Sequence, residues 1–173
     1  SNLLVVSKNR NIDDVDAVYK SGSILFGENR VQEAQSKFKN YAHVDEIQLH
    51  LIGPLQTNKV TQALSLFNVI QTLDRKKLVQ EIIKEKNKNL SIKTSKFYIQ
   101  INIGNEDQKS GVPITDVEEF YHYCLNSNIK IEGLMCIPPN NINPEPFFNK
   151  MLLIRDNLSS SLSLSMGMSS DYQ

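Results

Sequence analysis

The sequence predicts an α/β protein of the TIM, or (β/α)8, barrel class, and two observations carry that prediction. Short apolar runs alternate with helical stretches along the 173 residues, and the runs are nearly continuous in apolar and β-branched residues, as in parallel strands that are covered on both faces. The centres of successive runs lie on average about 27 residues apart, close to one βα unit of an eight-fold barrel of ~250 residues.

The apolar runs predict seven strands, at residues 3–6, 24–26, 48–52, 69–71, 97–103, 131–137 and 162–165. Between them, apolar residues recur with helical spacing. They predict six helices, at about residues 12–19, 31–38, 60–67, 74–83, 117–125 and 147–158. Asp74 is expected to cap the fourth helix.

A Rossmann sheet is the rival arrangement for alternating strands and helices. It would need G-x-G-x-x-G after the first strand, but no two of the seven glycines have the spacing G-x-G. We therefore expect one barrel domain over residues 1–173. The sequence has no initiator methionine and no evident end, so we expect a segment that is truncated at both ends, with an open seam in place of the eighth strand.

Composition excludes some classes of function. The 19 basic and 19 acidic residues give a net charge of zero, which argues against a general nucleic-acid or membrane-surface binder. No apolar stretch approaches the ~20 residues that span a bilayer. Two cysteines, Cys124 and Cys136, form no disulfide framework, so we expect a reducing, cytoplasmic location.

In a barrel of this class the site lies at the carboxyl ends of the strands. Lys8 follows the first strand directly, at the rim of the core. Burial there would lower the pKa of its amine and favour a Schiff base with a carbonyl group. The plainer interpretation is a strand-end lysine that extends into water.

The seventh strand is followed by a small turn that contains Gly167, at residues 165–169. Such a turn offers backbone N–H groups and hydroxyls to a phosphate, although it is also an ordinary βα turn. Arg30, Lys59 and the loop 107–111 also follow predicted strands. Two interpretations of each remain open, namely a role in the site or simple exposure to solvent. The three histidines form no metal-binding or H-E-x-x-H pattern.

Several motifs occur in order along the chain and together resemble one family: Leu4-Val5-Val6-Ser7-Lys8, Phe26-Gly27-Glu28-Asn29, the segment 50–59, Gln100-Ile101-Asn102-Ile103, Lys109-Ser110-Gly111, the segment 133–138 and Leu164-Ser165-Met166-Gly167-Met168-Ser169. The chain resembles the pyridoxal phosphate homeostasis proteins, whose barrel is similar to the N-terminal domain of alanine racemase (fold type III). The resemblance covers essentially the whole chain.

The resemblance implies a Schiff base between Lys8 and pyridoxal 5′-phosphate. It implies cofactor contacts from Asn29, beside the ring, and from four residues at the phosphate: Ser165, Gly167, Met168 and Ser169. It also implies that a helix before the first strand, a Gly-Thr turn after the eighth strand and an arginine facing the pyridine nitrogen lie outside these residues.

The family's function implies a protein that carries and buffers pyridoxal phosphate, without robust catalysis, as a monomer that passes the cofactor to apo-enzymes. One alternative is a pyridoxal-phosphate enzyme that resembles an amino-acid racemase. A second is a cofactor-free Schiff-base barrel of the aldolase kind. A racemase needs a base on each face of its substrate, and nothing in the sequence resembles the domain that supplies the second.

Overall fold

Strands and helices alternate in the computed structural model, which describes residues 2–88, 91–140 and 142–168. The strands of this described part are β1 (Val5–Val6), β2 (Leu25–Glu28), β3 (Gln48–Leu51), β4 (Val69–Leu73), β5 (Lys96–Asn102), β6 (Val112–Pro113), β7 (Ile131–Cys136) and β8 (Ser163–Ser165). The α-helices are α1 (Ile12–Lys20), α2 (Val31–Phe38), α3 (Val60–Leu66), α4 (Lys76–Lys86), α5 (Val117–Asn126) and α6 (Glu145–Leu158). Two short 3-10 turns precede α3 and α5.

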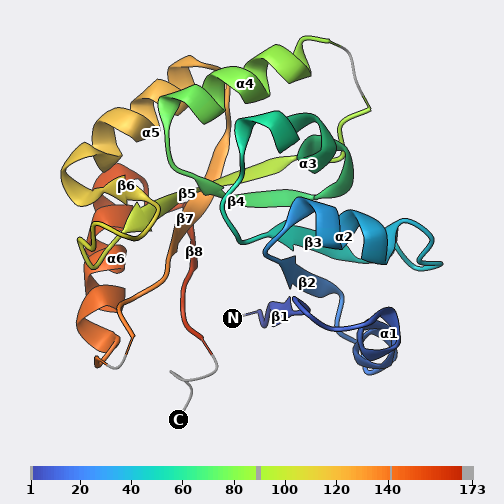
Figure 1. The fold of residues 1–173 in the computed structure, drawn as a ribbon. Coiled ribbons are helices and arrows are strands. Elements are labelled where there is room, and N and C mark those ends of the chain that lie inside the picture. The colour runs from blue at the N-terminus through green and yellow to red at the C-terminus, as the bar shows by residue number, and fades with distance from the viewer. Residues whose placement is uncertain (1, 89–90, 141, 169–173) are drawn as a thin grey trace.

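The strands form one parallel sheet in the order β1-β2-β3-β4-β5-β7-β8, which is the order of the chain. Figure 1 shows the sheet curled, with the helices around its outer side. Such an arrangement is that of a (β/α) barrel. Within the described residues no ladder joins β8 to β1, which confirms the predicted open seam.

The seven predicted strands and six helices are all present, with two differences. The sequence analysis missed β6, a strand of two residues that pairs with the end of β5. The predicted cap at Asp74 is wrong, because Arg75 is the residue before α4 and no side chain caps that helix. The Asp74 carboxylate instead accepts a 2.6 Å hydrogen bond from the Arg75 guanidinium.

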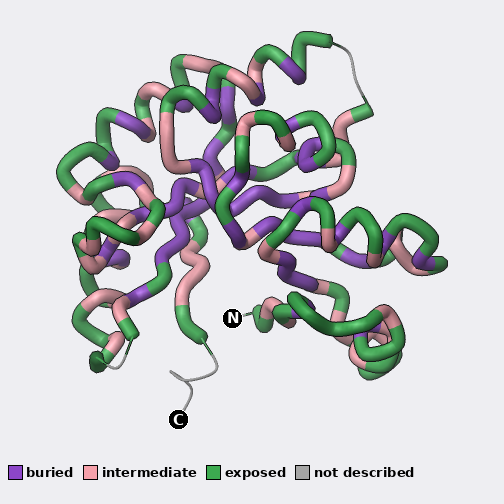
Figure 2. Tube along the Cα trace, in the orientation of Figure 1, coloured by how far each residue is buried: buried purple, intermediate pink, exposed green. Residues whose placement is uncertain are grey.

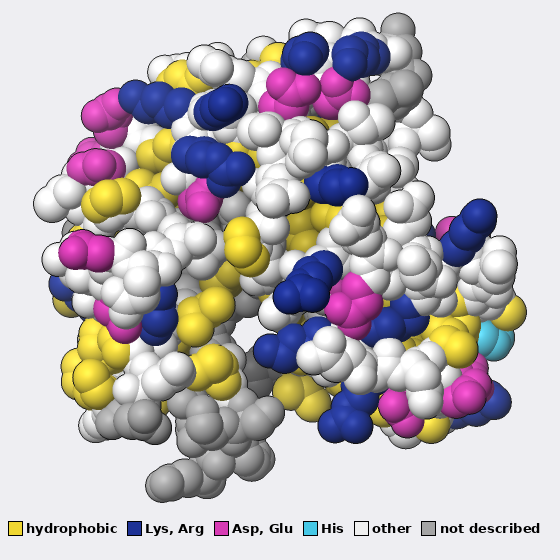
Figure 3. Space-filling model, in the orientation of Figure 1, with side chains coloured by type: hydrophobic (Ala, Val, Ile, Leu, Met, Phe, Trp, Pro, Cys, Tyr) yellow, Lys and Arg dark blue, Asp and Glu magenta, His cyan; other side chains and the backbone are white. Residues whose placement is uncertain are grey.

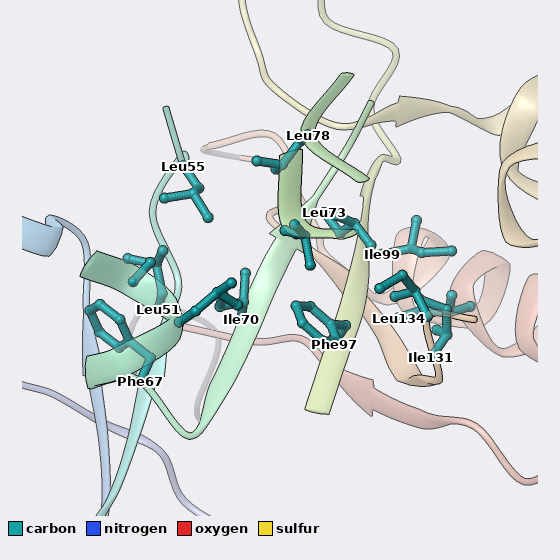
Figure 4. Packing of buried hydrophobic residues seen from close by; sticks show 14 of the residues in the cluster. Leu51, Leu55, Phe67, Ile70, Leu73, Leu78, Phe97, Ile99, Ile131 and Leu134 are labelled. Carbon is teal, nitrogen blue, oxygen red and sulfur yellow. The ribbon is translucent and has the colours of Figure 1, made fainter. Parts of the chain in front are cut away.

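Alternation along each strand divides the side chains between two faces. The outer face packs against the helices and forms the main core, in which Leu51, Ile70, Ile99 and Leu134 are fully buried (Figure 4). Each such side chain stabilises the fold by about 1.5–3 kcal/mol. In Figure 2 the buried segments are concentrated in the sheet.

The inner face is more polar. Strand pairing sets Gly27 beside His50, and sets Met135 between Gln100 and Ser165. We call His50, Gln71, Gln100 and Ser165 the inner polar group. In the described part of the chain, no helix is both long and apolar enough to cross a membrane.

Candidate functional site

Lys8 lies in the turn that follows β1. The Ser7 amide donates to the carbonyl of Gly27 at 3.0 Å, which extends the pairing with β2 by one residue. Lys8 itself is exposed, which agrees with the plainer interpretation of a strand-end lysine that extends into water and not with burial at the rim of the core. The physical reason is the open seam, because β1 has a neighbouring strand on one side only, and Val6 is also 46% exposed.

The backbone on both sides of Lys8 is held by charged groups from β2 and α2. Glu28 accepts a 2.7 Å hydrogen bond from the Ser7 hydroxyl, and the Lys37 ammonium donates to the Ser7 carbonyl at 2.6 Å. On the other side, the Asn9 amide donates to the Glu33 carboxylate at 2.6 Å. That amide holds the pKa of the Glu33 carboxyl below its usual value.

Asn29 follows β2 and is half-buried. Its backbone passes so close to Gly53 that a Cβ on Gly53 would lie 2.1 Å from the Asn29 carbonyl oxygen. The absence of a side chain at residue 53 therefore allows the two strand-end loops to pack against each other. This contact fixes the backbone position from which the Asn29 side chain extends.

The segment after β8 carries the other predicted contacts. Ser165 is half-buried, and its hydroxyl donates to Oε1 of Gln71 at 2.6 Å. Gly167 has a left-handed φ of 95° with open space around it, and Met168 is 39% exposed. Ser169, the last predicted contact, lies outside the described residues.

His50 and Gln71 continue the polar contacts into the sheet's interior. The Gln71 amide donates to Nδ1 of His50 at 2.8 Å, because a glutamine nitrogen cannot accept. Burial, with a smaller contribution from the charge of Lys96, lowers the pKa of His50 to about 4. His50 is therefore neutral near pH 7 and carries its proton on Nε2.

Two buried polar atoms of the inner group have no partner among the described residues: Nε2 of His50 and Oε1 of Gln100. Buried polar atoms are usually paired, so unpaired ones in a barrel interior are suited to a polar ligand or water. An accessible amine, a hydroxyl, and a glycine turn open to solvent are donors of the kind that a phosphorylated aldehyde requires. The residues present therefore have the functional groups that binding of pyridoxal phosphate requires.

Lys8 and Ser165 come from the two strands that border the open seam. β1 and β8 lie on opposite sides of it in Figure 1. The surface in Figure 3 is hollowed there, with Lys and Arg side chains on the side of β1 and β2 and hydrophobic side chains on the side of β8. Positive charge beside the hollow favours an anionic ligand.

The remaining polar strand ends differ in their surroundings. Arg30 is exposed and Lys59 is half-buried. The loop 107–111 is tied to the loop that follows β7, because Lys109 donates to the Pro138 carbonyl at 3.0 Å.

Neither a metal site nor a reactive thiol is indicated among the residues that the structure describes. The described ranges contain no group of three or more His, Cys, Asp or Glu side chains that could hold a metal ion. Cys124 and Cys136 are buried, as expected of small hydrophobic residues. Burial raises the pKa of the Cys124 thiol to about 12.

Sequence reasoning missed Lys37 and Glu33. Charged residues on a helix are usually solvated, yet the Lys37 side chain is only 7% exposed. A signal was present, because Glu33 and Lys37 are four residues apart and flank the apolar stripe of α2 that contains Ala34 and Phe38. The position of Ser7 beside that helix, which explains the burial, depends on the tertiary structure.

Known proteins resemble this chain over nearly all of its length. It is 38% identical over 180 residues to the pyridoxal phosphate homeostasis protein of Aquifex aeolicus, covering 99% of this chain and 78% of that protein. It is 33% identical over 191 residues to the human protein of the same name, covering 99% and 69%. No family model matches the chain.

Solved structures show the same likeness. PipY of Synechococcus elongatus PCC7942, determined without pyridoxal phosphate, is 29% identical and superposes with a TM-score of 0.88 over 98% of this chain and 83% of PipY. PipY with pyridoxal phosphate bound gives 0.80 at 27% identity, over 98% and 82%. Alanine racemase of Bacillus anthracis shares the fold alone, at 12% identity and a TM-score of 0.72 over 94% and 44%.

Proposed function

This chain belongs to the pyridoxal phosphate homeostasis protein family, and on that premise we propose that it binds pyridoxal 5′-phosphate through Lys8 and acts as a carrier and buffer of the cofactor. The observation that carries the proposal is the 38% identity over 99% of the chain to a protein of that name. The structure of PipY with the cofactor bound supports it, since that protein has the same fold.

Six residues would hold the cofactor: Lys8, Asn29, Ser165, Gly167, Met168 and Ser169. Pyridoxal phosphate supplies an aldehyde, which condenses with an amine and releases water, and a phosphate dianion. Lys8 supplies the amine from the rim of the sheet. The turn at Ser165 and Gly167 would offer backbone N–H donors to the anion, and the Ser165 hydroxyl would join them by leaving Gln71.

The names of the relatives support carriage over catalysis, because the proteins that this chain matches over nearly its whole length are named for pyridoxal phosphate homeostasis. The proposal includes three further parts: transfer of the cofactor to apo-enzymes, a monomeric state and a reducing cytoplasmic location. The zero net charge and the two buried cysteines are compatible with them.

Visible absorbance of the purified protein tests the proposal. The protein mixed with pyridoxal phosphate should become yellow, and borohydride should bleach it and leave a pyridoxyl group on the peptide that contains Lys8. Lys8→Ala should remain colourless. Lys84→Ala is the control, because Lys84 is an exposed lysine on α4 that pairs only with Glu81 in the described structure.

Two results would contradict the proposal. Colour that persists in Lys8→Ala would exclude Lys8 as the attachment point. Sustained, Lys8-dependent exchange of the α-proton of amino acids would identify an enzyme instead of a carrier.

A further inference from the structure

The turn that presents Lys8 is fixed on both sides by one network of charged groups. Its centre is the Lys37 ammonium, which lies 2.6 Å from the Ser7 carbonyl oxygen, 2.6 Å from Glu28 Oε1 and 3.3 Å from Glu33 Oε1. We call Glu28, Glu33 and Lys37 the turn clamp. The clamp comes from β2 and α2, so it connects the Lys8 turn to a strand and a helix of the core.

The clamp holds the residues on both sides of Lys8, because its hydrogen bonds go to Ser7 and Asn9. Ser7 is only 3% exposed, and both its hydroxyl and its carbonyl are bonded to the clamp. Asn9 has a left-handed φ of 58°, and its amide is bonded to Glu33. The Arg10 amide closes the turn by donating to the Ser7 carbonyl at 3.1 Å.

The burial of the clamp is unusual for charged groups. The side chain of Glu28 is 0% exposed and that of Lys37 is 7% exposed. Oε2 of Glu28 also lacks a hydrogen-bond partner among the described residues. Buried ion pairs contribute little net stability compared with apolar residues of similar size. A requirement for one fixed backbone geometry explains this pair better than stability does.

We propose that Lys37, together with Glu28 and Glu33, positions the Lys8 amine for attachment to the cofactor aldehyde. This inference rests on the proposed function. Lys37 contacts the backbone next to Lys8 and is a positioning residue that acts through it. Without the clamp, the turn would populate several conformations. Attachment of the cofactor would then have to order the turn, and the lost conformational entropy would weaken binding.

The affinities of two ligands distinguish an effect on the position of the Lys8 amine from a general effect on the binding site. Pyridoxal 5′-phosphate carries the aldehyde, whereas pyridoxine 5′-phosphate carries a hydroxymethyl group in its place and cannot condense with an amine. In Lys37→Met, the affinity for pyridoxal phosphate should fall about five- to twentyfold. The affinity for pyridoxine phosphate should stay within about twofold of the parent, because its phosphate and ring contacts are untouched.

The measurements are titration by visible absorbance for pyridoxal phosphate and calorimetry for pyridoxine phosphate, with circular dichroism to confirm the fold. Lys37→Arg should restore part of the affinity, since it keeps the positive charge. Lys84→Met is the matched control and should match the parent with both ligands. In a Lys8→Ala background, Lys37→Met should cause no further loss for either ligand.

The outcomes are distinguishable. A parent protein that never attaches pyridoxal phosphate at Lys8 would refute the proposed function. If the parent attaches it and Lys37→Met equals the parent, or loses both ligands equally, the positioning role is wrong. Should Lys37→Met fail to fold, Glu33→Met replaces it, because Glu33 is 26% exposed and methionine cannot accept the hydrogen bond of the Asn9 amide in its place. Glu33→Met should then lower only the affinity for pyridoxal phosphate, and an unchanged affinity would overturn the inference.

Discussion

The hydroxyl of Ser165 donates a 2.6 Å hydrogen bond to Oε1 of Gln71. Ser165 lies on β8 and Gln71 on β4, and β5 and β7 separate these two strands in the sheet. The bond therefore crosses the interior of the curled sheet. It links a proposed phosphate contact to the inner polar group, and it uses the single proton that a serine hydroxyl can donate.

A double-mutant cycle should detect this bond. Ser165→Ala, Gln71→Met and the double variant should show a coupling of about 1 kcal/mol in the free energy of unfolding, as expected for a part-buried neutral hydrogen bond. Saturating pyridoxal phosphate should reduce the coupling, because the hydroxyl cannot donate to Gln71 and to a phosphate at once. A coupling of zero without the cofactor would show that the bond makes no contribution to stability.

Stability should fall as the pH is lowered through the range in which His50 would take up a proton. Its pKa is lowered to about 4 in the folded state, from 6.5, so the unfolded chain binds the proton first. The contribution of neutral His50 to the free energy of unfolding is complete above pH 6.5 and is lost progressively as the pH falls towards 4. From pH 7.5 to pH 5 the loss due to His50 should be about 2 kcal/mol.

Urea unfolding of the parent and of His50→Gln at those two pH values measures this effect. The variant should lose less stability than the parent on acidification, since glutamine does not titrate. Equal losses in the two proteins would show that His50 is not the group responsible.

Gly53→Ala should destabilise the protein by about 2–4 kcal/mol, because the new Cβ would overlap the backbone of Asn29 and force the two loops apart. Affinity for pyridoxal phosphate should fall with it. Gly27→Ala is the comparison, since its Cβ would meet flexible side-chain tips of Ile52 and Leu4 at 3.1 and 3.3 Å. Thermal unfolding of both variants should show the smaller loss for Gly27→Ala.

Gly167→Ala should weaken cofactor retention more than it weakens folding. Both Gly167 and Gly22 have a left-handed φ, and a Cβ added at either would meet nothing within 4 Å, so alanine at either should cost about 1 kcal/mol through backbone strain. Gly22 follows α1, away from β8, and therefore serves as the control. Dialysis of the loaded proteins followed by absorbance should show faster loss of pyridoxal phosphate from Gly167→Ala alone. A collapse of thermal stability with unchanged affinity would contradict the phosphate role.

The sequence by itself determined the order and type of the elements apart from the short strand β6. Continuous apolar runs and helical stripes are local patterns, and each of the predicted strands and helices is present. The absence of an eighth βα unit led to the expectation of an open seam, which the sheet order confirms within the described residues. The positions of Lys8 and Ser165 at strand ends could also be predicted, because a strand ends where its apolar run stops.

Only the tertiary structure decided which polar groups meet. Lys37 is buried because α2 lies over Ser7, and Gln71 reaches Ser165 because the sheet curls, contacts that span 30 and 94 residues of sequence. The exposure of Lys8 likewise follows from the missing neighbour of β1. Local periodicity records which face of an element is apolar, but hydrogen bonds between distant residues depend on how strands twist and close, and no local pattern encodes that geometry.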